Sequence, residues 1–291
     1  MKSIRSSKNI PPDGEARQSQ VVSMYGPGAI VDLPEAAVII SGLDAWNERG
    51  SEIIYEPRLL QLARQTTGVA GLELRSPPRK DDSPRNLSGH IQALRFPEWS
   101  IVQKQIPDRE AFGIRCRARM LVHFNSVDGK NWKTHRDQDG SHKLVPVRFV
   151  MACPHGHLSD IPWRDFCFRE FRSKRTDALY LLEAGTGNDF TQIFVQNESG
   201  SHTRKLADAL IQEMNPLGDC QGRTPWLGRY SRDQEKCMTD GKPTKNRLLV
   251  RSATNAYFSE TISVISLPEE ADGLAKRVTE MKDDLIVVTE E

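Results

Sequence analysis

The feature that most constrains this fold is the way apolar residues come in short runs separated by polar stretches rich in proline and glycine. Runs of about four to eight residues are typical of strands within sheets, whereas a membrane-spanning helix needs about 20. The most apolar stretch, residues 29–40, is interrupted by Asp32, Pro34 and Glu35. With 37% hydrophobic and 27% charged residues, the pattern predicts a folded α+β chain of mixed short strands and helices with long polar loops.

Individual segments predict particular elements. Residues 29–43 combine two β-branched runs around Pro34, which indicates two short strands joined by a turn. Residues 57–64 place apolar side chains at helical spacing, and residues 116–124 alternate as a strand does. We expect the polar, glycine-containing residues 128–143 to form an excursion before the apolar run 144–153, which we assign to a sheet core.

The second half of the chain contains the clearest helical pattern. Residues 203–214 carry Leu206, Leu210, Ile211 and Met214 on one helical face, which predicts an amphipathic helix. The other predicted elements of this half are a helix at 163–172 and strands at 178–184, 191–196 and 261–267.

These patterns suggest a division of the chain along its length. We expect a mobile N-terminal arm at 1–16, an α+β region at 17–268, and a charged C-terminal helix or tail at 269–291. A split of the α+β region into two lobes near 125–143 is one option.

The N-terminus and the cysteines point to the cytoplasm. The first residues include basic side chains but no apolar core behind them, so we expect no secretory signal. Five cysteines, an odd number spread far apart, suggest reduced thiols or metal ligands instead of a disulfide framework.

Charge is unevenly distributed, although the net charge is only +1. Residues 223–251 hold eight Lys and Arg against three acidic residues, and residues 260–291 hold nine acidic residues against three basic ones. A basic segment beside an acidic tail suits DNA contact, self-association or partner docking, but it is also compatible with a solvated surface.

Two glycine-containing turns resemble phosphate-binding loops only superficially. The turn at 25–32 leads into a predicted strand and not a helix, so it offers no helix N-terminus to an anion. In the second, Pro243 follows Gly241 and Lys242 and blocks helix entry. We therefore predict no ATPase activity for this chain, and we assign no catalytic residue.

The segment Cys153-Pro154-His155-Gly156-His157 places three potential metal ligands within five residues. Zinc is the natural candidate, but a closed site needs four ligands, and the chain has no CxxC pair. The alternatives are a tight loop with structural hydrogen bonds or a hydrolase that uses Cys153 as its nucleophile. If a metal is present, the candidate ligands are Cys153, His157, Cys220 and Cys237.

A third candidate site is the basic segment and the turn before it. Arginines interleaved with tryptophan on a Pro/Gly framework can contact phosphates and stack on bases, but the tryptophan can equally pack in a core or an interface. The residues that we assign to partner or DNA binding are Arg223, Trp226, Arg229, Arg232, Arg247 and Arg251.

Several blocks, taken in order, resemble the DrmB family of the bacterial DISARM anti-phage systems, in its N-terminal half. They run nearly from end to end of the chain: 17–20, 25–33, 42–46, 56–59, 95–99, 144–150, 153–157, 160–163, 220–228, 251–258 and 266–268. The resemblance implies a non-catalytic defence subunit that pairs with a DrmA-like, SNF2-like helicase in a complex that engages phage DNA.

The resemblance also implies features that this chain lacks. The family carries CxxC-type pairs, similar to zinc-ribbon ligands, where this chain has residues 100–104 and 195–200 without cysteine. We therefore expect no bound zinc and no other cofactor. The family continues into a further C-terminal domain, so a separately encoded C-terminal half is a possible partner. A stand-alone, zinc-stabilised DNA-binding module is the main alternative function.

Overall fold

A computed structural model describes most of the chain as two units. The described residues are 18–33, 36–48, 51–78, 89–126, 133–185, 189–253, 256–265, 277 and 281. The larger unit comprises residues 1–50 and 78–259, and the smaller comprises residues 51–77 and 260–291. The expected arm at 1–16 lies outside the described residues, as does nearly all of the expected helix or tail at 269–291. None of the described helices combines the length and apolar character needed to cross a bilayer.

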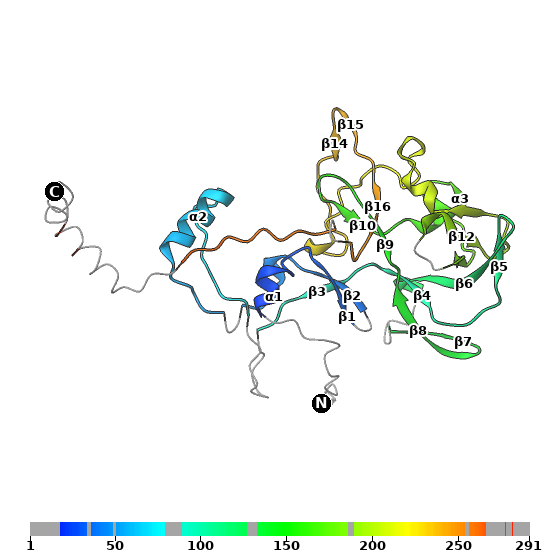
Figure 1. Ribbon diagram of the computed structural model, residues 1–291, viewed down its shortest axis with the longest axis horizontal. Coiled ribbons are helices and arrows are strands. Elements are labelled where there is room, and N and C mark those ends of the chain that lie inside the picture. Colours follow the sequence, from blue (N-terminus) through cyan, green and yellow to red (C-terminus); the bar gives the residue numbers. More distant parts are fainter. Residues whose placement is uncertain are drawn as a thin grey trace, which may run out of the picture. The chain divides into compact units, whose positions relative to one another are not determined.

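The larger unit is built mainly of antiparallel sheets (Figure 1). Its largest described sheet has the order β13-β12-β11-β6-β4-β8-β7, and β5 pairs with β6 beside this path. The strands of this sheet are β4 (Trp99–Val102), β5 (Arg109–Ala111), β6 (Ile114–His123), β7 (Thr134–Asp137), β8 (Gly140–Pro146), β11 (Leu179–Glu183), β12 (Ile193–Asn197) and β13 (Thr203–Lys205).

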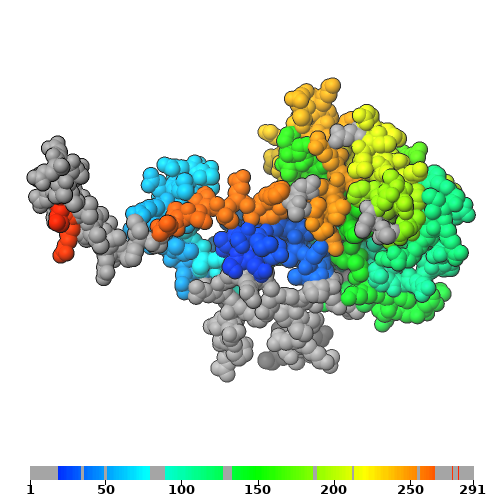
Figure 2. Space-filling view, in the orientation of Figure 1, coloured from blue at the N-terminus to red at the C-terminus, as the bar shows by residue number. Residues whose placement is uncertain are grey.

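Three smaller sheets complete the described strands of the larger unit. Their orders are β1-β2-β3, β10-β9-β16 and β14-β15. The strands are β1 (Ile30–Leu33), β2 (Ala36–Ile40), β3 (Ala93–Arg95), β9 (Phe149–Ala152), β10 (Leu158–Ser159), β14 (Met238–Thr239), β15 (Lys242–Pro243) and β16 (Arg247–Val250). Figure 2 shows the exposed β14–β15 hairpin projecting from the surface of this unit.

The main core lies where α3 (Trp163–Phe168) covers one face of the large sheet. Trp163 and Phe166 are fully buried there against Leu181, Val195 and the β9 residue Phe149. Burying aromatic side chains of this size contributes several kcal/mol of hydrophobic free energy, roughly 25 cal/mol for each Å² of apolar surface removed from water. This packing fixes β9, and therefore the loop that follows it, against the large sheet.

A second cluster ties the β1-β2-β3 sheet to β9 and β10. Ile39, Phe96, Val150 and Leu158 form it, and Trp226 packs against it from the segment that follows residue 220. Two chemically distinctive parts of the sequence, the 153–157 loop and the 220–229 turn, are therefore held side by side by apolar packing.

The other α-helices with bounds in the described part of the chain are α1 (Gln18–Ser23) in the larger unit and α2 (Pro57–Thr67) in the smaller one. Pro57 begins α2 because its fixed φ and missing N–H suit the first turn of a helix. Gly68, with φ of 71°, ends the helix in the left-handed conformation, and its N–H bonds to the carbonyl of Arg64.

Many sequence-based predictions are confirmed. The chain is α+β and mostly sheet. The segment 29–43 contains the antiparallel pair β1–β2, and the segment 178–196 contains the antiparallel pair β11–β12. The helix predicted at 57–64 and the strand predicted at 116–124 are α2 and β6.

The helix predicted over residues 203–214 is wrong. Thr203–Lys205 pairs instead with the edge of β12, which satisfies backbone groups that would otherwise lack partners. Arg204 is only 5% exposed, and its Nη1 donates to the carbonyl of Phe166 at 3.0 Å. The chain then continues as short 3-10 turns, Leu206–Leu210 and Gln212–Met214. Tertiary pairing therefore overrides the helical spacing of the apolar residues.

Three other predictions need correction, and a fourth, the sheet-core assignment of residues 144–153, holds in a refined form. The polar excursion expected at 128–143 contains most of a β7–β8 hairpin, whose turn is held by Lys104 through Asp137 and Asp139. The run 144–153 divides between β8 and β9, which belong to different sheets. Of the strand predicted at 261–267, residues 261–265 form no strand, and 266–267 lie outside the described residues. The helix predicted at 163–172 ends at Phe168 because Arg169 adopts a left-handed conformation with φ of 56°.

Candidate functional site

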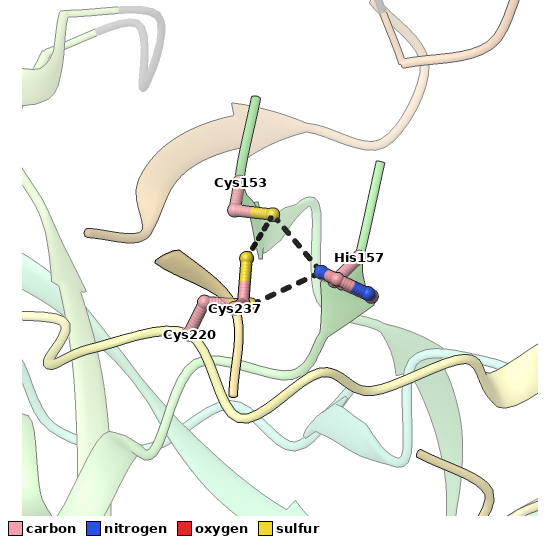
Figure 3. Close-up of side chains that lie close together, drawn as sticks. All are labelled: Cys153, His157, Cys220 and Cys237. Atoms are coloured by element: carbon pink, nitrogen blue, oxygen red, sulfur yellow. Dashed lines mark hydrogen bonds between the residues drawn. The ribbon is translucent and has the colours of Figure 1, made fainter. Parts of the chain in front are cut away.

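The Cys153 to His157 segment is the connecting loop of the β9–β10 hairpin. Cys153 donates its backbone N–H to the carbonyl of His157 at 3.0 Å, and Gly156 donates to the carbonyl of Cys153 at the same distance. Gly156 has φ of 86°, a backbone conformation that residues with a Cβ rarely adopt. The loop geometry directs both Cys153 and His157 toward the same point (Figure 3).

Two further cysteines reach this point from distant parts of the sequence. Cys220 donates its N–H to the carbonyl of Thr244 at 2.7 Å, and Thr244 donates its own N–H to the carbonyl of Cys237 at 3.0 Å. The backbone around β14 and β15 therefore holds Cys220 and Cys237 together, facing the loop of the β9–β10 hairpin.

The ligand atoms of these four residues lie within 4.8 Å of one another. The Cys153 and Cys237 sulfurs are 3.8 Å apart, and His157 Nδ1 lies 3.3 Å from Cys153 Sγ and 3.4 Å from Cys220 Sγ. A disulfide would require about 2.05 Å between sulfurs. Tetrahedral zinc, with bonds of about 2.3 Å to sulfur and 2.0–2.1 Å to nitrogen, requires sulfur–sulfur distances of about 3.8 Å and sulfur–nitrogen distances of about 3.6 Å. The cluster can therefore hold a metal such as zinc.

The surrounding hydrogen bonds are those expected around a metal-binding thiolate cluster. His157 uses Nδ1 toward the cluster, and its Nε2 lies 2.7 Å from Asp233 Oδ2, as in carboxylate–histidine–zinc arrangements. The N–H of Gly222 donates to Cys220 Sγ at 3.3 Å, and His155 Nδ1 lies 3.1 Å from Cys237 Sγ. Because three thiols and one imidazole complete a tetrahedron, such a site has no open position for a reacting water molecule.

The thiols of this cluster differ in how readily they ionise. Burial raises the pKa of Cys220 to about 12, and the nearby Cys153 contributes because adjacent thiolates repel each other. Burial opposes ionisation of Cys237 too, but hydrogen bonds with Thr244 and His155 lower the pKa of this thiol to about 6. A divalent cation bound to the cluster would stabilise all three groups as thiolates.

The structure thus brings together Cys153, His157, Cys220 and Cys237, the four residues that the sequence analysis named as ligands if a metal is present. They converge although the chain has no CxxC pair. Asp233 was not identified from the sequence, in which nothing but its place in the basic segment distinguishes it from other acidic residues. Its position opposite His157 is apparent only in the folded chain.

The six residues assigned to partner or DNA binding lie in different environments. Arg232 and Arg247 are exposed, while Arg223 is partly buried. Trp226 packs on the cluster around Phe96, and its ring lies against Gly28. Arg229 forms an ion pair with Glu98, and Arg251 pairs with Asp32 at 3.1 Å.

Burial lowers the pKa of Arg251, although Asp32 opposes this shift. Arg251 and Trp226 therefore have structural contacts of their own, and Arg232 and Arg247 are the members of the set most available to a partner.

Comparison with known proteins gives two matches over the same region. The sequence profile of a domain of unknown function, DUF8724, matches residues 17–258. The DISARM protein DrmB of Bacillus paralicheniformis is 27% identical over 242 residues, which cover 83% of this chain and 38% of that protein. The chain therefore spans well under half the length of this relative.

Proposed function

Because the chain belongs to the DUF8724 family, we propose that it is a non-catalytic subunit of a DISARM-like anti-phage defence complex. The similarity to a DISARM protein over 83% of the chain is the observation that carries this proposal. In this proposal the subunit pairs with a DrmA-like, SNF2-like helicase, which hydrolyses ATP, and it assists the engagement of phage DNA.

The exposed arginines of the basic segment provide the partner or DNA surface in this proposal. Arginine suits both roles because its planar guanidinium donates paired hydrogen bonds to carboxylates or phosphates. Arg232 and Arg247 are the members to test first, since Arg229 is already bound to Glu98 and its removal would disturb the fold.

Co-purification with a DrmA-like helicase tests this proposal. If Arg232 and Arg247 dock the helicase, the double variant R232A/R247A fails to co-purify. If they contact DNA, the complex still forms. The slope of the logarithm of its DNA-binding constant against the logarithm of salt concentration then becomes shallower by about 0.9 for each lost phosphate contact.

The variant R115A is the matched control, because the Arg115 side chain is 85% exposed and lies outside the basic segment. A wild-type chain that neither binds the helicase nor alters DNA binding by the helicase would contradict the proposed function. A double variant that retains both properties would assign these arginines to a solvated surface.

We also propose that Cys153, His157, Cys220 and Cys237 hold one structural zinc ion, in place of the metal-free chain expected from the missing CxxC pairs. The ion would cross-link the β9–β10 loop to the segments around Cys220 and Cys237, which are distant in the sequence. Metal analysis should then find about one zinc per wild-type chain and little in C237S. The control C167S should retain the metal, because Cys167 is buried in the main core and is not part of the cluster.

The same measurements distinguish this site from a cysteine hydrolase. Cys153, His157 and Asp233 are arranged in the order nucleophile, base and carboxylate, with separations of 3.3 and 2.7 Å. However, Cys153 is only 6% exposed and shares His157 with Cys220, which favours metal binding over attack on a substrate. Stoichiometric zinc without thiol reactivity supports the structural role, whereas a metal-free, rapidly alkylated Cys153 would support the hydrolase.

A further inference from the structure

A pocket of about 390 Å³ lies beside the candidate metal centre in the larger unit. Its walls come from the end of β3 and the turn that follows, from β10, and from the segment after Cys220. Leu94, Phe96, Leu158 and Pro225 provide apolar surface. The volume falls within the range of small-molecule sites, which is roughly 300–1,000 Å³.

Asp160 is an acidic group of this pocket that is held without a cationic hydrogen-bond partner among the described residues. Both of its carboxylate oxygens accept the backbone N–H of Glu98, each at 3.1 Å. A carboxylate has about four acceptor positions, so Asp160 retains capacity for further N–H donors. Burial raises the pKa of Asp160 to about 6, and the nearby Glu98 carboxylate adds to the shift. The ionised form is therefore costly until a donor approaches.

Glu98, the other acidic group of the pocket, already has its partners. It forms an ion pair with Arg229, and His123 Nε2 lies 3.2 Å from its other oxygen. Arg229 also lies over the Phe124 ring, 4.7 Å from its centroid, and donates to Asn125. This arrangement is a rigid wall of the pocket, which leaves Asp160 as the acidic group able to accept from a ligand.

Arg223 supplies the complementary feature. Of the charged side chains that line the pocket, it is the one without a hydrogen bond or ion pair to the described part of the chain. Its backbone carbonyl accepts from the N–H of Leu158, which fixes the residue at the pocket while its guanidinium stays available. A free guanidinium is suited to a phosphate, to which it can donate two parallel hydrogen bonds.

We propose that this pocket binds one unstacked nucleotide of single-stranded DNA, with the Watson–Crick edge of a guanine base on Asp160 and a phosphate on Arg223. Guanine presents two adjacent N–H donors, N1–H and the N2 amino group, which match the two oxygens of a carboxylate. Apolar walls accept the faces of a base, and unstacked bases are commonly recognised through stacking and through their Watson–Crick edges. A simple anion is disfavoured because Asp160 would repel it.

This inference deepens the proposed DNA engagement and rests on it. Binding is measured at pH 7.5 with the full chain and labelled single-stranded 12-mers of thymidine that carry one central deoxyguanosine, one central deoxyinosine, or no substitution. Deoxyinosine retains N1–H but lacks the N2 amino group, so the wild-type chain should bind the guanosine oligonucleotide about tenfold more tightly than the other two. Free dGMP should compete if the pocket accepts the isolated nucleotide as well as the strand.

The variants separate the pocket from general electrostatics. R223Q should weaken binding of the guanosine oligonucleotide about tenfold, whereas R115Q, which removes the same charge from a side chain that is 85% exposed and lies outside the basic segment, should change it less than twofold. D160N should abolish the preference for guanosine over inosine while remaining folded by circular dichroism.

Equal losses in R223Q and R115Q, a D160N chain that keeps its preference, or no binding by the wild-type chain would each overturn the inference. Co-purification with the helicase, measured on the same preparations, reports separately on the proposed function. A chain that pairs with the helicase but shows no pocket-dependent binding refutes only the nucleotide site.

Discussion

Replacing Asp160 by asparagine should make the protein more stable at neutral pH. In the folded state the pKa of this carboxyl is about 6, compared with 3.8 for an ordinary aspartate, because burial disfavours its charged form. A difference of about 2 pKa units corresponds to about 3 kcal/mol of unfolding free energy lost when the group is ionised.

The net gain in D160N should be smaller, about 1–2 kcal/mol. Asparagine keeps one oxygen to accept from the N–H of Glu98, but an uncharged acceptor is weaker, and Asp160 retains some access to solvent through the pocket. For a domain of this size the gain corresponds to an increase in Tm of roughly 2–8 °C.

The pH dependence follows from the sign of the shift. Because the folded pKa is raised, the folded state binds more protons than the unfolded state between about pH 4 and 6, and stability falls as pH rises through this window. The penalty is complete above pH 6 and absent below about pH 4. The charged and titratable groups that face Asp160 are Glu98, His123, Arg95 and Arg229, and all are unchanged in D160N.

Urea unfolding of wild-type and D160N chains at pH 7.5 and pH 5.0 measures this effect. D160N should be more stable at pH 7.5, and the difference should shrink at pH 5.0, where most of the wild-type Asp160 is protonated. A variant that is less stable than wild type at pH 7.5, or a difference that does not depend on pH, would refute this account. A gain in stability with a loss of binding would identify Asp160 as a residue maintained for function at the expense of stability.

Three further predictions concern other polar side chains that have hydrogen-bond or ion-pair partners. E98Q should lower the unfolding free energy by about 1–3 kcal/mol at pH 7 in urea titrations. The reason is that hydrogen bonds from His123 and Arg229 lower the pKa of Glu98 to about 2 despite its burial. This stabilisation is complete above about pH 4.5 and should disappear as the pH falls toward 2. R204A should lower the unfolding free energy by about 2–4 kcal/mol in the same assay, since it leaves the Phe166 carbonyl and Asp208 without their partner. The control is R175A, whose guanidinium is half exposed. A smaller loss in R204A than in R175A would contradict a structural role for the buried Arg204 side chain. D233N should weaken zinc affinity about 10–100-fold in competition with a chromophoric chelator, because it removes the carboxylate that orients His157, whereas unchanged affinity would argue against that role.

Local patterns predicted the parts of the fold that depend on local physics. The strands at 30–33 and 36–40, the helix beginning at Pro57, and the strand β6 follow from β-branched runs, proline placement and side-chain alternation. These signals act over a few residues, so a single sequence contains them. The helix predicted at 203–214 was wrong because Thr203–Lys205 pairs as a strand with the edge of β12, and this pairing is not visible in the local sequence.

For the candidate metal centre, too, the sequence predicted one part and only the tertiary structure showed the other. The sequence by itself determined which side chains could bind a soft cation, since cysteine and histidine are few and three of them fall within five residues. Only the tertiary structure decided that Cys220 and Cys237, 63 residues from His157 and 84 from Cys153 respectively, complete the set, and that Asp233 and not another acid faces His157. The physical reason is that such convergence depends on hydrogen bonds through Thr244 and on the packing of Trp226 and Leu158, which act between segments that no local pattern connects.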